Sequence, residues 1–597
     1  MYGFRFSPRP NRAHEIAWRP WGEAAFQEAQ REDKPILLSI SAVWCHWCHI
    51  MDETSYSDPD AIRLINADFI PVRVDNDQRP EVNQRYNMGG WPTTAFLTPH
   101  GDLIAGGTYI PPHQFKEALG QVADLYRQQK AAVYRSAEEM KNRRLQRVRR
   151  VVSGTQLSAQ IVDLVTRAVT ALYDPFFGGF GTQPKFPMPD AQHLLLDLYA
   201  QFRDPIFLRM VVKTLDGMLQ GAVFDKVEGG FFRYSTQRDW SEPHYEKMAE
   251  DQGALMRLLL RTWLYTGATA YRDAAQAVVA YVNRRLYTPE MGAFWGSQDA
   301  DETYYSQDKQ GREKLLPPLV DRTVYTNWNG QLAVAYMEAS DLMGQPHLRQ
   351  QAIRSLGFLW EHLCQQPGNV LFHCWAEGKP FVEGTLPDYA WVALAMAEAY
   401  RRTGAQVWLE RSQALAQAML ERFWDAQSGG FWDVGPGVAP LGYLQFKEKA
   451  INDNTVAAQA LRLLANLTGQ ADYATRAYDT LSAFAGSVQD YGEHAAPYAR
   501  EVLRQLFPPV EVSIVGPGDA LETRALLEAA FSIPYPCIDP ILVDGGDAEA
   551  LASRGFTKGE KPQAYVCLQG ACLPPIDDPA RLAEAIGQFL AIRGETQ

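Results

Sequence analysis

Short apolar runs separated by polar turns characterise the first part of the chain. Residues 35–40 form a continuous apolar run bounded by turn formers, which is the pattern of a buried strand. Residues 69–75 alternate and predict a second strand, and residues 93–97 predict a third that opens directly after Pro92. Residues 49–64 contain no glycine and predict a helix after the first strand. The order of these elements predicts an α/β domain.

From about residue 155 to residue 500 the apolar positions follow helical spacing instead, for example over 161–172, 255–263 and 392–400. A corner motif of an aromatic or apolar residue, usually an acid, and then Gly-Gly-Phe or a relative recurs between pairs of these stripes, ending at Phe180, Phe231, Phe294, Phe372 and Phe431. A repeat of about 50–60 residues that holds two helices is a helical hairpin unit. We expect about six hairpins, and the aromatic corners favour a closed (α/α)6 toroid over an open solenoid.

The tail returns to an α/β pattern, with strands expected over 510–515, 541–543 and 564–567 and helices over 521–531 and 579–589. The chain is therefore predicted to be multidomain: an α/β domain over 1–130, a basic helical linker over 131–154, the all-α toroid over 155–507 and a small α/β segment over 508–597. The seven basic residues of the linker region suit a solvated helix better than a nucleic-acid-binding arm.

Composition narrows the classes of function. The 597 residues carry a formal net charge of −13, which argues against binding to a phosphate backbone, and no nucleic acid partner is expected. No apolar run approaches the ~18 residues of a membrane span. The first residues lack the apolar core of a signal peptide, so we expect a cytoplasmic protein with no membrane partner.

The sequence Cys45-His46-Trp47-Cys48-His49 follows the first predicted strand directly. At the start of a helix, free N–H groups and the helix dipole stabilise a thiolate, so Cys45 is the candidate nucleophile and its pKa is expected below that of a free thiol. Cys48 is placed to resolve a mixed disulfide. A c-type haem attachment site, a zinc site and an inert structural pair are the alternatives. The lack of an export signal argues against haem, the lack of a second CxxC argues against zinc, and no cofactor or metal is expected.

Pro92 is the second feature that favours redox chemistry. We expect the Trp91–Pro92 bond to be cis and to lie against the dithiol, where the Trp91 backbone would pair with an extended substrate. The strand–CxxC–helix–strand–helix–Pro–strand order is that of a thioredoxin fold. Residues 12–130 resemble the thioredoxin-like domain of the family typified by spermatogenesis-associated protein 20 and YyaL, through segments 18–22, 38–40, 45–49, 74–75, 90–92, 96–99 and 107–109.

The same resemblance continues through segments 185–187, 229–235, 243–248, 298–302 and 328–330 and covers nearly the whole chain. It implies a second region similar to the (α/α)6 toroids of glycosidases and sugar epimerases. One departure concerns the dithiol: thioredoxins carry a buried Asp six residues before the nucleophile, where this chain has Ser39. The usual proton acceptor for the resolving step is therefore missing.

A toroid gathers its loops at one mouth, and those of this chain combine aromatic with charged residues. The candidate pocket consists of Lys185, Arg233, Tyr234, His244, Glu246, Asp299, Asp301 and Asn329. Aromatic rings beside carboxylates suit a sugar-like molecule, and His244 with Glu246 is the candidate catalytic pair of an epimerase-like reaction. A competing interpretation treats acids at helix starts, such as Asp190, Asp388 and Asp453, as helix caps.

Apart from the CxxC pair, the seven cysteines are scattered, as buried thiols in a reducing compartment are. Cys567 and Cys572 flank a turn, and free thiols are the favoured state for both. Three hypotheses follow for the whole chain. It is a thiol–disulfide oxidoreductase acting on a protein disulfide or thiol, a carbohydrate-active toroid with a regulatory redox domain, or a non-catalytic binding scaffold. The first is favoured because its motif is the most specific.

Overall fold

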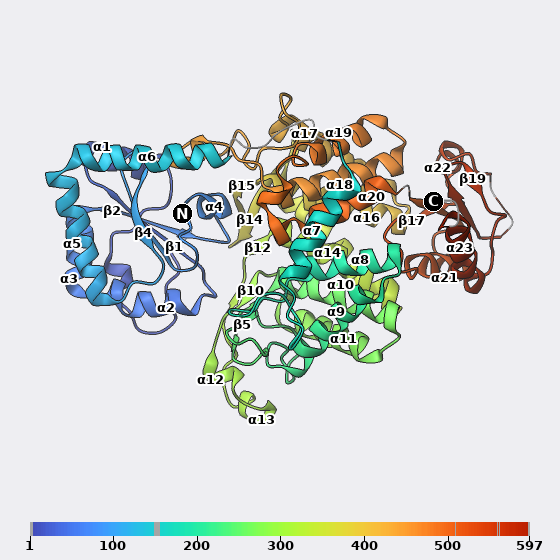
Figure 1. Ribbon diagram of the computed structural model, residues 1–597, viewed down its shortest axis with the longest axis horizontal. Coiled ribbons are helices and arrows are strands. Elements are labelled where there is room, and N and C mark those ends of the chain that lie inside the picture. Colours follow the sequence, from blue (N-terminus) through green and yellow to red (C-terminus); the bar gives the residue numbers. More distant parts are fainter. Residues whose placement is uncertain (1–3, 149–155, 508, 558, 560, 595–597) are drawn as a thin grey trace.

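Figure 1 shows the computed structural model, which describes residues 4–148, 156–507, 509–557, 559 and 561–594. Three parts follow one another along its longest axis: an N-terminal α/β domain, a large helical body and a C-terminal α/β segment. The predicted fold class is confirmed in all three parts. None of the helices in the described ranges is both long and apolar enough to cross a membrane.

The N-terminal domain is built on a four-stranded sheet in the order β2-β1-β3-β4, with β1 Ile36–Ser41, β2 Ile70–Asp75, β3 Thr93–Leu97 and β4 Leu103–Gly107. Strand β1 runs parallel to β2 and antiparallel to β3, and all its residues are buried. One face packs on α1 (Glu23–Glu32) and α4 (Pro80–Tyr86), and the other on α2 (His46–Glu53), α3 (Pro59–Asp68) and α5 (Pro112–Gln128). The two-sided burial explains the continuous apolar run.

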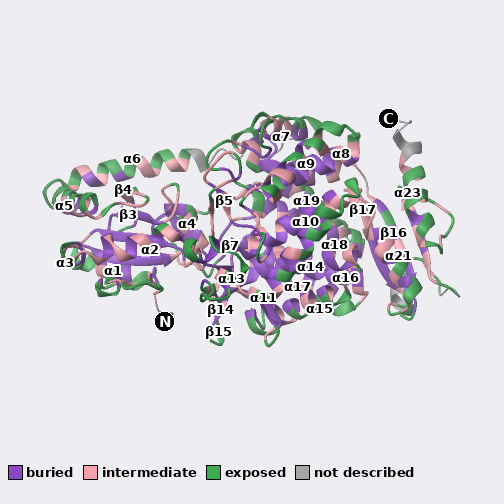
Figure 2. Ribbon diagram, turned by 90° about the horizontal axis from the view of Figure 1, so that it is seen from below, coloured by how far each residue is buried: buried purple, intermediate pink, exposed green. Residues whose placement is uncertain are grey.

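Helix α6 (Lys130–Val148) runs beside β4 and leads towards the helical body. The chain is helical here as far as Val148, and residues 149–154 of the predicted linker lie outside the described residues. Much of its surface is exposed (Figure 2), and its charges are used in local pairs such as Lys141 with Glu138. Arg144 also reaches Glu448 of the helical body, at 2.7 Å.

The helical body is a closed ring. Its inner helices contact one another in a cycle and return to the first: α8 Pro189–Phe202, α10 Ala249–Thr266, α14 Thr326–Met343, α16 Leu386–Thr403, α18 Ile451–Thr468 and α20 Ala496–Leu506. Each also packs on one outer helix: α9 Pro205–Gln220, α11 Thr269–Arg285, α15 Pro346–Phe358, α17 Gln406–Phe423, α19 Ala471–Ser482 and α7 Ala159–Ala171. This is the predicted (α/α)6 toroid, and its closure follows from the helix contacts themselves.

The Gly-Gly-Phe corners share one internal construction. In the corner of Asp225, the Lys247 ammonium donates to the Asp225 carboxylate at 2.7 Å, and a Gln252 side chain pairs with the Phe231 backbone. Gly229 adopts φ +79°, and a Cβ there would lie 2.4 Å from the Ala277 carbonyl oxygen. Glycine is therefore required at this turn. The repeated sequence motif thus encodes a repeated structural corner.

The C-terminal segment forms a sheet in the order β17-β16-β18-β19, with β16 Val510–Gly516, β17 Ile538–Asp544, β18 Gln563–Leu568 and β19 Ala571–Cys572. Helices α21 (Leu521–Phe531), α22 (Ala548–Ser553) and α23 (Pro579–Gly594) accompany it. The expectation of free thiols at Cys567 and Cys572 was wrong, because the two form a disulfide. They lie directly opposite each other in the β18–β19 register, which brings their side chains together.

Candidate functional site

The dithiol lies where the N-terminal domain meets the toroid. Cys45 is the N-cap of α2, and the Cys48 backbone N–H donates to the Cys45 sulfur at 3.2 Å. The two cysteines are joined in a disulfide, and the Trp91–Pro92 peptide bond is cis, as predicted. The hydrogen bond and the helix start are the features that favour a Cys45 thiolate once the disulfide is reduced.

The toroid covers this disulfide. Cys45 and Cys48 retain 4% and 2% of their exposure and belong to the same apolar cluster as toroid residues Phe231 and Met248. Trp47, within the same motif, keeps 45%. A folded protein surface therefore has no direct route to either sulfur in this arrangement.

Arg233 of the toroid closes one side of the dithiol site. Its guanidinium lies 4.3 Å from the Trp44 ring centroid and 5.0 Å from that of Trp91. Trp44 and Trp91, which flank the cysteine and proline motifs, also meet edge to face at 5.7 Å. Each cation–π contact of this kind contributes about 0.5–2 kcal/mol. A single toroid side chain, Arg233, therefore contacts residues next to both the cysteine motif and Pro92.

A histidine pair extends from the dithiol helix towards the Asp299–Glu302 loop. His49 Nε2 donates to the Val43 carbonyl at 3.0 Å, which leaves the Nδ1 lone pair facing Asp299 Oδ2 at 3.7 Å. Burial lowers the pKa of His49 and raises the pKa of Asp299 well above its usual range. His49 directly follows Cys48 in the sequence, and Ser39 stands where thioredoxins carry the usual acid.

The predicted pocket residues divide into two groups. Arg233 and Asp299 contact residues of the redox motifs, Trp44 with Trp91 and His49 respectively. His244 Nδ1 contacts Glu246 Oε1 at 3.2 Å, and the Tyr234 ring stacks on His244 at 4.5 Å. Their role as a sugar-type site stays a prediction.

Lys185, Asn329 and Asp301 have structural partners. The Lys185 ammonium donates to Asp174 at 2.7 Å, repeating the lysine–aspartate pair of the other corners. Asn329 brackets the Phe294 backbone as Gln252 brackets Phe231, and Asp301 caps the short helix α12 (Glu302–Tyr305). Recurrence of the same contacts in neighbouring corners explains these residue types without a ligand.

A chain of polar contacts links the dithiol to the inner ring. The Trp44 indole N–H donates to Asp77 at 2.6 Å, and His373 donates from Nε2 to the Asp77 carbonyl at 2.7 Å and from Nδ1 to Asp388 at 2.8 Å. Both nitrogens of His373 face acceptors, so the ring is an imidazolium, and the Asp388 carboxylate raises the pKa of His373 to about 9. The charged His373 therefore contacts the N-terminal domain through the Asp77 carbonyl, while Asp388 of the toroid supplies its countercharge.

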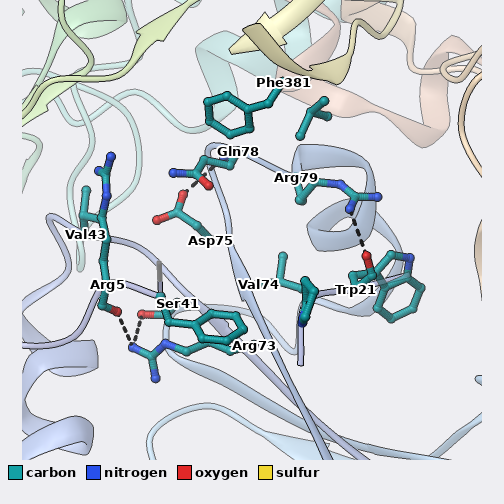
Figure 3. A pocket seen from close by; sticks show the side chains of 13 residues that line it. Arg5, Trp21, Ser41, Val43, Arg73, Val74, Asp75, Gln78, Arg79 and Phe381 are labelled. Carbon is teal, nitrogen blue, oxygen red and sulfur yellow. Dashed lines mark hydrogen bonds between the residues drawn. The ribbon is translucent and has the colours of Figure 1, made fainter. Parts of the chain in front are cut away.

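A cavity of about 260 Å³ lies behind the dithiol, between β2 and the strand β15 (Lys379–Glu383) (Figure 3). Arginines line it, but they are engaged within the chain. Arg73 donates to Ser41 and to the Asp52 carboxylate, and Arg79 to Glu81 and the Trp21 carbonyl. These pairs offer little free charge to an anion.

The larger polar cavities lie in the toroid, and sequence reasoning missed their chemistry. A mouth cavity of about 270 Å³ and a central cavity of about 400 Å³ share Glu250, Gln331, Trp391 and Asp453. Glu250 was not singled out from the sequence, and a helix cap was the competing interpretation of Asp453. The N-cap of α18 is Ala450, and Asp453, in the first turn of the helix, forms no capping box with it. The available signal was the placement of acids in the first turns of several inner helices.

Comparisons with known proteins cover the N-terminal domain and, for one relative, nearly the whole chain. Residues 9–145 match the family model described as Thioredox_DsbH, a protein of unknown function, DUF255. Spermatogenesis-associated protein 20 of Homo sapiens is 27% identical over 96% of this chain and 90% of its own length, which confirms the resemblance expected from the sequence. Thiol:disulfide interchange protein DsbD of Campylobacter jejuni is 34% identical over 12% of this chain and 13% of its own.

Among solved structures, a sugar epimerase from a ruminal bacterium is similar over 55% of this chain and 86% of its own, at 12% identity and a TM-score of 0.45. A cellobiose 2-epimerase from Bacillus thermoamylovorans is similar over 54% of this chain and 86% of its own, at 10% identity and a TM-score of 0.44.

Proposed function

We propose that the protein is a thiol–disulfide oxidoreductase whose Cys45–Cys48 pair acts on a small or extended thiol or disulfide. The observation that carries the proposal is the pairing of a helix-capping Cys45 with a cis-Pro92 motif under the toroid cover. The motif supports exchange chemistry, and the cover favours a substrate narrow enough to enter the interface over a folded protein.

The reaction proceeds by two exchanges. In the reduced protein, the Cys45 thiolate attacks one sulfur of the substrate disulfide, and the other sulfur leaves as a thiolate that takes up a proton. Cys48 then loses its proton and attacks the Cys45 sulfur, which releases the second substrate thiol and leaves the Cys45–Cys48 disulfide. Two electrons pass from the dithiol to the substrate, and an external dithiol restores the reduced state. His49, with Asp299 beyond it, supplies the proton acceptor near Cys48.

The compartment proposed for this reaction is the reducing cytoplasm. Cys364, Cys374 and Cys537 are buried free thiols, and burial raises the pKa of each. Thiols of this kind persist without pairing in a reducing compartment.

A sugar-type reaction at His244 and Glu246 is the second candidate. The specific observation in its favour is the 3.2 Å contact between the imidazole and the carboxylate, with Tyr234 stacked on the ring. A histidine oriented in this way suits a general base.

The test compares Cys45→Ser, Cys48→Ser and wild type on two disulfides, a small one (hydroxyethyl disulfide) and a protein one (insulin). We expect wild type to reduce the small disulfide at least tenfold faster than insulin. Cys48→Ser should accumulate a mixed disulfide on Cys45, and Cys45→Ser should be inactive. Equal rates on both substrates would remove the argument from the cover. Exchange activity in Cys45→Ser would overturn the assignment of the nucleophile.

A further inference from the structure

The central cavity of the toroid holds carboxylates that form no ion pair with any residue in the described ranges. Asp190, Glu250, Asp251 and Asp453 lie in the first turns of α8, α10 and α18 and line this cavity of about 400 Å³. Its arginines, by contrast, are paired with other acids, as Arg257 is with Glu338. The centre of the ring therefore holds carboxyl groups that no cation of the described residues pairs with.

Helix capping does not explain these acids. An acid in a first helical turn is stabilised by the helix dipole, and Asp388 uses that position fully in a capping box with Thr385. Asp453 holds the matching place on α18 but makes no such bond, and its Oδ2 is shut off from solvent without a hydrogen-bond partner. Burial and the neighbouring Asp433 and Asp388 raise the pKa of Asp453 to about 7. An orphan carboxylate is costly unless a ligand completes it.

Two further buried groups on the cavity walls lack partners. Glu81 of the N-terminal domain lines the mouth and is 2% exposed; its Oε1 accepts from Arg79, whereas its Oε2 accepts from no described residue. His193 lines the centre and is 3% exposed. Arg261 donates to His193 Nδ1 at 3.0 Å, so the ring proton lies on Nε2, which is without a partner. The walls therefore offer two orphan acceptors and one orphan donor.

The other residues that line the two cavities indicate which kind of ligand fits. Trp391 lines both cavities and Trp328 lines the mouth, and tryptophan faces attract organic cations. The described residues contain no group of three or more histidine, cysteine or carboxylate side chains placed to hold a metal ion. Carboxylates with tryptophans match an ammonium group, and the His193 N–H matches a hydroxyl oxygen. We propose that this cavity binds a small protonated amine that also carries hydroxyl groups.

This site is separate from the dithiol and does not depend on the proposed oxidoreductase function. The cavity volume is within the range of small-molecule sites. Because Glu81 and Asp77 of the N-terminal domain line the mouth, the ligand passes the docked domain on its way in.

The test is calorimetric titration of the full chain with three matched probes: glucosamine, glucose and putrescine. We expect glucosamine to bind at least tenfold more tightly than glucose, which lacks the ammonium, and more tightly than putrescine, which lacks hydroxyls. Asp453→Asn and Glu250→Gln should each weaken glucosamine binding at least tenfold. The matched control is Glu410→Gln, which removes an exposed carboxylate from α17. Thermal melts establish that all three variants fold.

A second measurement is the number of protons released when the ligand binds. At pH 7 a carboxyl group of pKa about 7 is roughly half protonated. Binding of a cation should therefore release protons, measured as a dependence of the binding enthalpy on the ionisation enthalpy of the buffer, and Asp453→Asn should reduce this release. Equal binding of glucose and glucosamine, or no binding of any probe at 10 mM, would overturn the proposal. Putrescine binding as tightly as glucosamine would overturn its hydroxyl part.

Discussion

The dithiol and the central cavity differ in how their polar groups are exposed and paired. At the dithiol, the two cysteines are almost fully buried, and Arg233 of the toroid lies over the rings of Trp44 and Trp91. In the cavity, carboxylates face open space without partners. A buried disulfide can react when a movement of the domains exposes it, whereas an unpaired carboxyl group needs a ligand as its partner. The accessibility of the sulfurs therefore limits the reactions of the dithiol, and the unpaired polar groups determine which ligands the cavity binds.

The buried His373–Asp388 ion pair of the toroid contacts the N-terminal domain through the Asp77 carbonyl, and breaking it should give the largest effect. His373 and Asp388 are 2% and 0% exposed, and His373 also holds the Asp77 carbonyl of the N-terminal domain. His373→Gln leaves Asp388 without its countercharge, so we expect a loss of about 3–5 kcal/mol in the free energy of unfolding. Urea unfolding measures it.

The same variant should uncouple the two sites. Loss of the docking contact should raise the rate at which the reduced dithiol is alkylated, because the toroid cover opens more often. His494→Gln is the control, since the His494 side chain is 74% exposed. An unchanged free energy of unfolding in His373→Gln would show that the His373 contacts do not stabilise the docking of the N-terminal domain.

The pH dependence of stability gives the second effect. The pKa of His373 is raised from 6.5 to about 9, so the folded state holds this proton more tightly than the unfolded state. Its contribution is fully present below pH 6.5 and is lost as the pH rises through about 9. The loss amounts to about 3 kcal/mol for a shift of this size. The difference between wild type and His373→Gln isolates it from other titrating groups, and a difference that does not change between pH 6 and 9.5 would contradict it.

Substitutions of Arg233 test whether the dithiol and the central cavity influence each other. Arg233→Ala removes two cation–π contacts, which should cost about 1–2 kcal/mol and speed alkylation of reduced Cys45 about tenfold. Burial raises the pKa of Glu250 to about 8 and that of Asp251 to about 6, and the Arg233 charge opposes this rise. Its loss should therefore leave these acids more protonated and weaken amine binding. Arg233→Lys keeps the charge and should restore binding better than it restores the cover. Equal effects of both variants on both readouts would refute this division.

The two sites also differ in how far the sequence predicted them. Cys45, Cys48 and Pro92 lie in short local patterns, and the fold places them as the patterns indicated. The Gly-Gly-Phe corners were equally recognisable as a sequence repeat. The sequence did not show, however, which of their residues stabilise the corner and which are free to bind a ligand. Lys185 shows why: a lysine beside an aromatic loop suits a pocket until its partner Asp174 is known.

The central cavity was not predictable from local patterns. Glu250 and Asp453 are far apart in the chain and come together only because α20 closes the ring on α8. In sequence, an acid in a first helical turn is indistinguishable from a cap, and the missing hydrogen bond of Asp453 appears only in three dimensions. Cys567 and Cys572 misled for a related reason. The argument from compartment ignored the strand register, which sets the two side chains opposite each other.

The Cys567–Cys572 disulfide should give the smallest effect on either site, and it supplies the control that the comparison needs. It closes a short loop in the C-terminal segment, with a sequence separation of 5, so replacing both cysteines by serine should cost about 2 kcal/mol there. Exchange rates and glucosamine affinity should stay within twofold of wild type, because that segment meets the toroid at the end away from the dithiol (Figure 1). A change of more than twofold in either quantity would show that the C-terminal segment acts on that site and would rule out this double variant as a control.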